Sequence, residues 1–69
     1  MAKNQHFTVK YQNFLQGYAL AIGFLIRAHG QDSIAMDAMR EHGVTLDDLI
    51  KARCDAFDLD PIREVWRRK

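Results

Sequence analysis

The sequence has little cysteine, proline or net charge, and these shortages exclude several classes of protein. Cys54 is the single cysteine, so the chain cannot form an internal disulfide, and a lone thiol is typical of a reducing compartment. Ten Lys and Arg residues against nine Asp and Glu residues give a net charge of +1, too small to attract nucleic acid or an anionic membrane strongly. We therefore expect a cytoplasmic protein without disulfides.

A long hydrophobic run is also lacking. The longest apolar segment, YALAIGFLI at residues 18–26, has nine residues, whereas a transmembrane helix needs about 20. With 48% hydrophobic residues and no low-complexity tract, the 69 residues are expected to form one globular domain. Within it, residues 1–7 are expected to be a flexible tail or an arm that orders on dimerisation. We expect no membrane partner.

What the sequence does contain is helical periodicity. Apolar residues repeat with a period near 3.6 in four segments, and no segment has the period of two typical of a strand. The first segment, residues 9–29, has Thr8 as its N-cap and Gly30 at its end. Its predicted inward face is centred on Tyr18 and comprises Tyr11, Phe14, Leu15, Tyr18, Ile22, Leu25, Ile26 and His29.

Three shorter helices are predicted to follow, because each begins with a capping residue. The second helix is predicted over residues 33–42, between Asp32 and Gly43. The third is predicted to run from the capping box of Thr45 and Asp48 to Phe57, and the fourth is predicted to begin at Asp60-Pro61. The predicted inward residues are Ile34, Ala35, Ala38 and Met39, then Leu46, Leu49, Ile50, Cys54 and Phe57, and finally Ile62, Val65 and Trp66. The predicted fold class is all-α, a small helical bundle of one long and three short helices.

The long first helix has a second apolar strip outside its inward face. Five residues form it: Gly17, Leu20, Ala21, Phe24 and Ala28. One interpretation places this helix at the centre of the bundle, so that Leu20 and Phe24 belong to the core. The other holds that three short helices cannot cover a helix about 30 Å long, which leaves the strip for a partner. The partner-binding residues are then these five and Arg27, with Asn13 at the rim, and the expected partner is a second copy of the chain.

Residue types that carry catalysis are present, but their spacing is not typical of a site. His6, His29, His42 and Cys54 contain no pair at the spacing of a zinc module, so we expect no metal and no cofactor. Several aspartates fall near predicted helix N-termini, where carboxylates cap free N–H groups. Cys54 is predicted on an inner face, where burial raises the pKa of a thiol and keeps it inert. We therefore expect a protein that is not an enzyme.

One segment resembles a DNA-binding motif. AMREHGVTLDDLIKAR, within residues 33–53, resembles a helix-turn-helix unit because a glycine stands in the turn, an apolar residue follows it, and a leucine occupies a core position. Met39 stands where such units prefer alanine. Asp47, Asp48 and Asp55 on the would-be recognition helix oppose phosphate binding. In this alternative the phosphate contacts are Lys51 and the basic C-terminal residues Arg63, Arg67, Arg68 and Lys69.

The function expected from the sequence is therefore binding, of a protein in the first place and of DNA in the alternative. A very short helical chain without a cofactor motif resembles the small accessory proteins of bacteriophages and mobile elements, many of which inhibit or redirect a host protein. That resemblance implies a regulatory protein, such as an inhibitor. We expect it to act as a homodimer, and the sequence does not identify its further protein partner.

Overall fold

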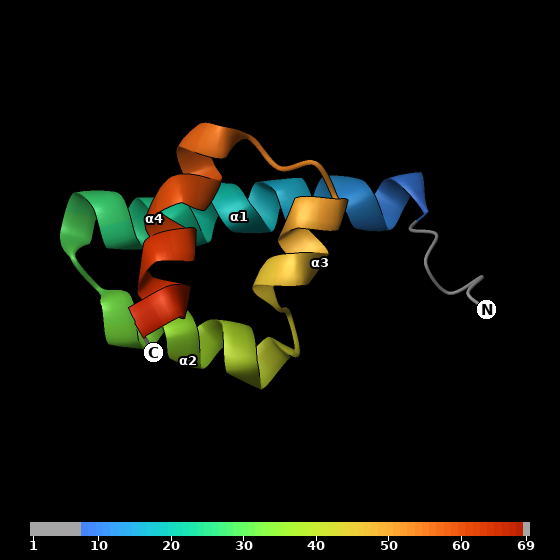
Figure 1. Ribbon diagram of the computed structural model, residues 1–69. Coiled ribbons are helices and arrows are strands. Elements are labelled where there is room, and N and C mark those ends of the chain that lie inside the picture. Colours follow the sequence, from blue (N-terminus) through green and yellow to red (C-terminus); the bar gives the residue numbers. More distant parts are fainter. Residues whose placement is uncertain (1–7, 69) are drawn as a thin grey trace.

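The computed structural model describes residues 8–68, which fold into four helices (Figure 1). They are α1 (Val9–His29), α2 (Asp32–His42), α3 (Leu46–Lys51) and α4 (Ala56–Arg68). No strand occurs among the described residues, and the predicted all-α bundle of one long and three short helices is confirmed. No helix in this part of the chain is both long and apolar enough to cross a membrane. The predictions for residues 1–7, His6 among them, and for Lys69 lie outside the described residues.

The predicted starts of α1 and α3 are confirmed by their capping bonds. The Thr8 Oγ1 accepts a hydrogen bond of 3.0 Å from the backbone N–H three residues later, which caps α1. Thr45 and Asp48 form the two reciprocal bonds of a capping box at α3. At α2 the prediction is off by one residue. Gln31 takes the cap position without a side-chain bond, and Asp32 lies in the first turn, where its charge favours the positive end of the helix dipole.

Three helices are followed within two residues by a residue in the left-handed conformation. Gly30 and Gly43 hold this position after α1 and α2, with φ of 62° and 69°. After α3 the position is held by Arg53, also at φ 62°, and its N–H donates back to a carbonyl in the last turn of the helix. The prediction that the third helix continues to Phe57 is therefore wrong. The helix ends at Lys51, and no glycine marks this end in the sequence.

Arg53→Gly is expected to stabilise the protein. A side chain in the left-handed region costs roughly 1–2 kcal/mol, which glycine avoids, although a more flexible unfolded chain offsets part of this gain. We expect the urea midpoint to rise by an amount corresponding to about 0.5–1 kcal/mol. Arg53→Ala is the control, because it removes the charge and keeps the strained backbone. An equal gain in both variants would mean that the arginine side chain, and not the backbone, is responsible.

α4 begins at Ala56 rather than at the predicted Pro61. Asp55, and not Asp60, caps it. The Asp55 carboxylate accepts a bond of 2.9 Å from the Phe57 N–H, and the Asp55 carbonyl accepts bonds from the N–H groups of Asp58 and Leu59. Pro61 therefore lies inside α4, where its missing N–H removes one bond from the helix ladder. The helix is longer at its start than the Asp-Pro pair indicates.

The core lies where α1 meets the other three helices. Its buried hydrophobic residues are Leu15, Ala19, Ile22, Ala35, Met36, Met39, Val44, Leu49, Ala52, Cys54, Leu59, Ile62 and Val65. α1 and α4 approach closely at Gly23, where an ideal Cβ would stand 2.6 Å from the Asp58 carbonyl oxygen. Gln12 and Gln16 tie the end of α3 to α1, because both side-chain amides donate to the Ala52 carbonyl, at 3.1 and 3.0 Å.

Eight of the twenty predicted inward residues are buried, and several large ones are exposed. The prediction is confirmed for Leu15, Ile22, Ala35, Met39, Leu49, Cys54, Ile62 and Val65, while Ala38 and Leu46 are partly buried. Ile34, Ile50, Phe57 and Trp66 are exposed. Phe57 leaves the predicted face because it belongs to the first turn of α4, which buries its neighbour Asp58 instead. Trp66 lies in the last turn, where the other helices cover only part of its ring.

Candidate interaction surface

α1 buries a different face from the predicted one. Its buried residues are Leu15, Ala19, Ile22 and Gly23. On a helical wheel this set is centred roughly 90° from Tyr18, the centre of the predicted inward face. Of that predicted face, Leu15 and Ile22 are buried, Tyr18, Leu25 and Ile26 are partly buried, and Tyr11, Phe14 and His29 are exposed. The prediction of the inward face is wrong because α4 packs on the side of Gly23, where a missing side chain permits the close approach.

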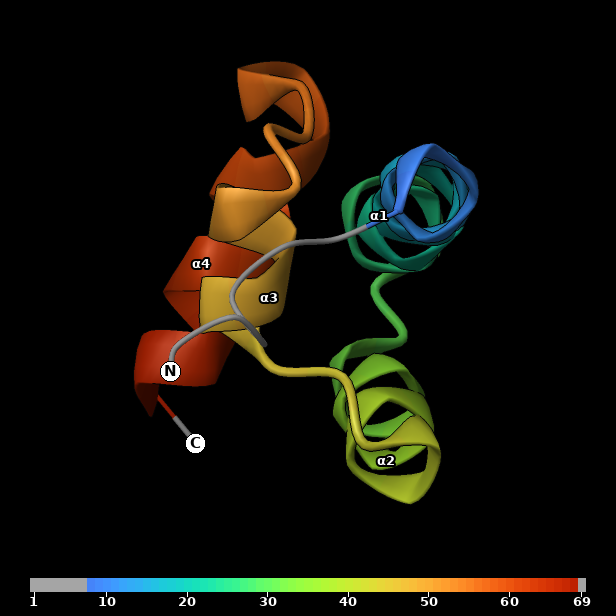
Figure 2. The same cartoon turned by 90° about the vertical axis from the view of Figure 1, so that its right-hand side faces the viewer.

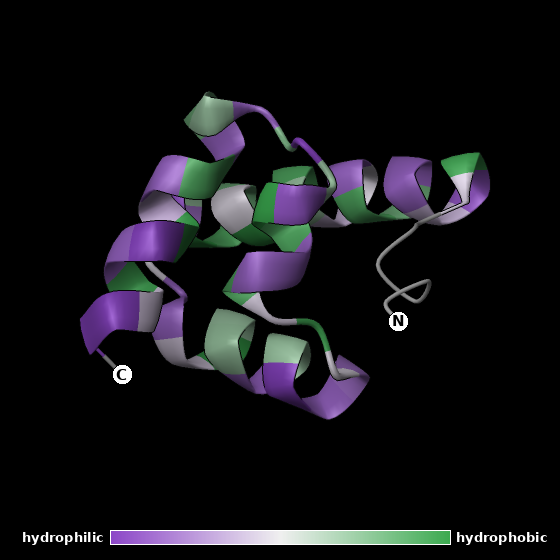
Figure 3. Ribbon diagram, turned by 45° about the vertical axis from the view of Figure 1, so that its right-hand side comes forward, coloured by the Kyte–Doolittle hydropathy of each residue, from purple (hydrophilic) through white to green (hydrophobic). Residues whose placement is uncertain are grey.

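The uncovered side of α1 is largely apolar, and we call it the outer face. It comprises the exposed residues Tyr11, Phe14, Gly17, Leu20, Ala21, Phe24 and Ala28. Leu20 is 59% exposed and Phe24 is 46% exposed, so the interpretation that places both in the core is wrong. Figure 2 shows the cause, because α3 and α4 lie on one side of α1 and α2 lies below it, which leaves the remaining side open. Figure 3 shows hydrophobic residues in successive parts of α1.

Sequence reasoning missed two residues of the outer face, Tyr11 and Phe14, because it assigned them to the core. A signal for the outer face was present in the sequence. Phe14, Gly17, Ala21, Phe24 and Ala28 are spaced alternately by three and four residues. This spacing is the repeat by which two helices pack along a shared seam. This repeat centres the outer face on the small residues Gly17 and Ala21, whereas the predicted inward face is centred on Tyr18.

Ring contacts hold the N-terminal part of the outer face in place. Tyr11 stacks on Phe14 with ring centroids 6.0 Å apart, and Phe14 lies 5.6 Å from Tyr18. The Tyr18 hydroxyl is 2.6 Å from Nδ1 of His42, the last residue of α2. Burial raises the pKa of the Tyr18 hydroxyl above its ordinary value. The row of rings therefore joins α1 to α2 and limits the side-chain freedom that a binding partner would otherwise have to restrict.

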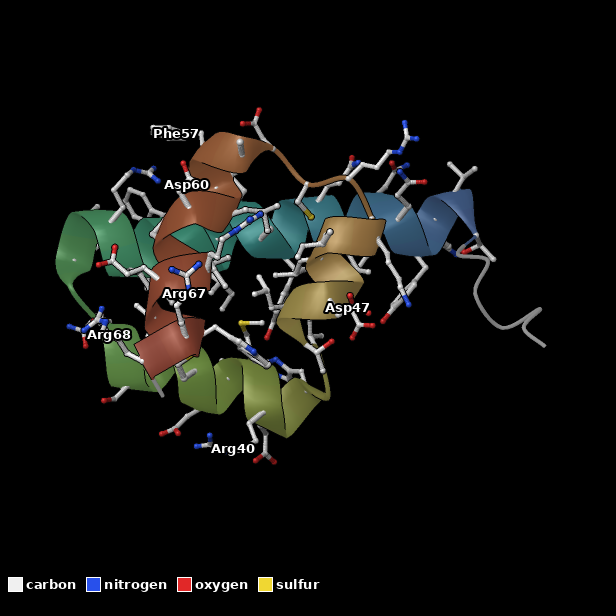
Figure 4. All side chains as sticks on the ribbon, viewed as in Figure 1. Arg40, Asp47, Phe57, Asp60, Arg67 and Arg68 are labelled. Carbon is white, nitrogen blue, oxygen red and sulfur yellow. The ribbon has the colours of Figure 1, made fainter. Side chains whose placement is uncertain are left out.

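The C-terminal part of the outer face is bordered by cationic and aromatic contacts. The Phe24 ring meets the His29 ring edge to face, with centroids 5.0 Å apart. The Arg27 guanidinium carbon lies 4.1 Å from the centre of the Phe57 ring, which α4 contributes (Figure 4). Arg27, predicted as a rim residue, therefore bridges α1 and α4. Phe57 is an exposed aromatic residue at this edge that sequence reasoning placed in the core.

An open pocket of about 430 Å³ lies beside the outer face. It is lined by Gln16, Gly17, Leu20, Arg53, Asp55 and Asp58. Two of its polar groups already have structural roles, because the Gln16 amide bonds to the end of α3 and the Asp55 carboxylate caps α4. None of the lining residues has a hydroxyl or thiol nucleophile.

The thiol and the histidines are placed in structural surroundings. Cys54 is buried and its thiol donates to a backbone carbonyl of α1 at 3.5 Å. Burial raises the pKa of the Cys54 thiol, and the nearby Asp58 carboxylate raises it further. His29 and His42 are the last residues of α1 and α2, as predicted. Among residues 8–68, no three His, Cys, Asp or Glu side chains are grouped as metal ligands require.

The residues predicted for DNA binding are dispersed, and two of them are paired with carboxylates. Lys51 Nζ lies 3.1 Å from an Asp47 oxygen, and the Arg68 guanidinium lies 3.3 Å from an Asp32 oxygen. The remaining three are Arg63, whose Nε is buried, Arg67, which is exposed, and Lys69, which lies outside the described residues. Figure 4 places Arg68 near the end of α4 and Asp47 on α3, well apart. α3 itself has six residues, a length of about 9 Å, which offers little helix to a DNA groove.

The exposed hydrophobic residues are concentrated on one helix. Among the described residues, nine large hydrophobic side chains are exposed, and five of them belong to α1. The other four are spread over α2, α3 and α4. An apolar surface gathered on one element is typical of an interaction site.

Comparisons with protein-family models, with curated proteins and with solved structures find no match for the chain.

Proposed function

We propose that the chain is a non-enzymatic protein-interaction module and that the outer face of α1 is its binding surface. The observation that carries the proposal is the exposure of Phe14, Leu20 and Phe24 around the small residues Gly17 and Ala21. Apolar surface in contact with water costs about 25 cal/mol per Å², so a helix face of this kind gains free energy when another protein covers it. Small residues one turn apart let a second helix approach closely.

The partner proposed for this face is a second copy of the chain. A chain of this size buries only about 60% of its unfolded surface, and oligomerisation is one way in which small domains enlarge their core. A twofold dimer would cover two outer faces at once. A regulatory role, such as inhibition of a further protein, and a cytoplasmic location belong to the same proposal. Lys51 and Arg68 do not support the DNA-binding alternative as phosphate contacts, since both are paired with carboxylates.

The test is the solution mass of the protein, measured by light scattering over a dilution series from about 100 μM to below 1 μM. We expect a two-chain mass for the parent at the highest concentration. The double variant Leu20→Ser/Phe24→Ser is expected to show a single-chain mass and unchanged helicity. Each anchor of an interface contributes on the order of 1–2 kcal/mol, so loss of two apolar anchors should raise the dimer Kd by about 30- to 1,000-fold.

The matched control is Ile34→Ser, which removes an equally exposed apolar residue from α2, outside the outer face. Its mass should equal that of the parent at every concentration. A single-chain mass for the parent at about 100 μM would contradict the homodimer. Unfolding of the Leu20→Ser/Phe24→Ser variant would contradict the assignment of these two residues to a binding surface.

A further inference from the structure

We infer that two copies of α1 pack antiparallel across their outer faces, with Ala21 at the twofold axis. This inference rests on the proposed function, because it requires that the outer face binds a second copy. In such a pair, residues equally far on either side of Ala21 lie opposite each other. The shape of the face, its charges and its size each favour this arrangement.

The shape of the outer face is complementary to itself in this register. The facing pairs are Phe14 with Ala28, Gly17 with Leu25, Tyr18 with Phe24, and Ala21 with its own copy. Tyr18 and Leu25 are partly buried residues that border the outer face. Two of these pairs put a bulky residue against a small one, and the small residue at the axis lets the helix axes approach to about 8 Å. A parallel pair would instead place Phe14 against Phe14 and Gly17 against Gly17. Crowded layers would then alternate with empty ones, and both are unfavourable.

The charges of α1 also favour the antiparallel arrangement. The helix carries Lys10, Arg27 and His29 and no acidic residue. A parallel pair would place Lys10 beside Lys10 and Arg27 beside Arg27, which brings like charges together. In the antiparallel pair each Lys10 lies near the C-terminal end of the other α1, where the carbonyl groups form the negative end of the helix dipole. Charge therefore opposes the parallel pair more strongly than the antiparallel pair, in which Lys10 lies about three residues along the axis from His29 of the second copy.

The outer face is also large enough to hold two chains together. Tyr11, Phe14, Leu20 and Phe24 are each about half exposed, which amounts to on the order of 100 Å² for each side chain. Covering them in two copies would remove on the order of 800 Å² from water. The backbone and the small residues between them would bring the total to about the 1,000 Å² that a specific interface needs.

Disulfide trapping tests the orientation, with mild oxidation of the full chain followed by a non-reducing gel. A disulfide needs Cβ atoms about 3.5–4.5 Å apart. Ala21→Cys is therefore expected to give a linked dimer on its own. Ala28→Cys alone should stay at least about tenfold less linked, because the two copies of residue 28 would lie about 20 Å apart along the helices. An equal mixture of Ala28→Cys and Phe14→Cys should link. The parent, whose single thiol on Cys54 is buried, is the unlinked control.

The outcomes separate this inference from the proposed function. Linking of Ala21→Cys and of the mixture, with little linking of Ala28→Cys alone, supports the antiparallel pair. Efficient linking of Ala28→Cys alone, in a protein with a two-chain mass, overturns the orientation and leaves the proposed function in place. A two-chain mass without linking of Ala21→Cys overturns the register. A single-chain mass for the parent at about 100 μM overturns the antiparallel pair together with the proposed homodimer. Circular dichroism of each variant verifies that it is folded.

Discussion

Gly23→Ala is expected to lower the free energy of unfolding by about 2–3 kcal/mol, a large part of the stability of so small a domain. The added Cβ would stand 2.6 Å from the Asp58 carbonyl oxygen and 3.3 Å from the carbonyl carbon of the same residue. These are backbone atoms in α4, so they cannot turn aside as a flexible side chain would. Relief requires α1 and α4 to separate, which would expose the core between them.

Gly17→Ala is the matched control, because it makes the same change on the same helix. Nothing lies within 4 Å of the position that its Cβ would take. Alanine favours a helix interior over glycine by roughly 0.5–1 kcal/mol, so this variant should be slightly more stable than the parent. Urea denaturation of both variants at low concentration measures the difference. Equal stability of the two would mean that α1 and α4 do not approach each other closely at Gly23.

Local signals in the sequence located the helix ends where those signals are strong. Thr8, Gly30, Gly43 and the capping box at Thr45 each act through bonds within a few residues, and all four are found where they were predicted. The turn after α3 could not be predicted in this way, because Arg53 takes a backbone conformation that usually requires glycine. Without that turn, the predicted third helix ran on through the start of α4.

The buried face of α1 could not be predicted from hydrophobicity, because α1 is apolar on two sides. The aromatic side of Tyr11 and Phe14 is the more hydrophobic and was predicted to be inward. Packing against α4 is decided instead by close approach, and this favours the side of Ala19 and Gly23. The buried face of α1 therefore lies roughly a quarter turn around the helix from the predicted inward face.

The same rotation explains why the candidate binding surface was predicted in part. The strip of Gly17, Leu20, Ala21, Phe24 and Ala28 is exposed, as the partner interpretation requires. The aromatic residues at its N-terminal end were missed, because a pattern on one helix does not show where the neighbouring helices lie. Phe57, at the other end, was missed because its position depends on the unexpected start of α4.

Ala19→Glu and Ala21→Glu are expected to have opposite effects, although the two residues are neighbours on α1. Ala19 is fully buried, and an unpaired carboxylate in a core costs several kcal/mol, so Ala19→Glu should not fold. Ala21 is exposed, and glutamate has nearly the helix propensity of alanine, so Ala21→Glu should fold as the parent does. In the proposed dimer, however, two carboxylates would meet at the axis, and the dimer Kd should rise more than about 100-fold.

Circular dichroism and light scattering on the two variants separate the two reasons why residues 18–26 are apolar on every side. Loss of helicity in Ala19→Glu alone would show that one side of the segment serves the core of its own chain. A folded Ala21→Glu with a single-chain mass would show that the other side serves association, because the substitution leaves the core untouched. Retention of a two-chain mass by Ala21→Glu would mean that the chain associates through another surface, and the outer face would then have to be explained by a different partner.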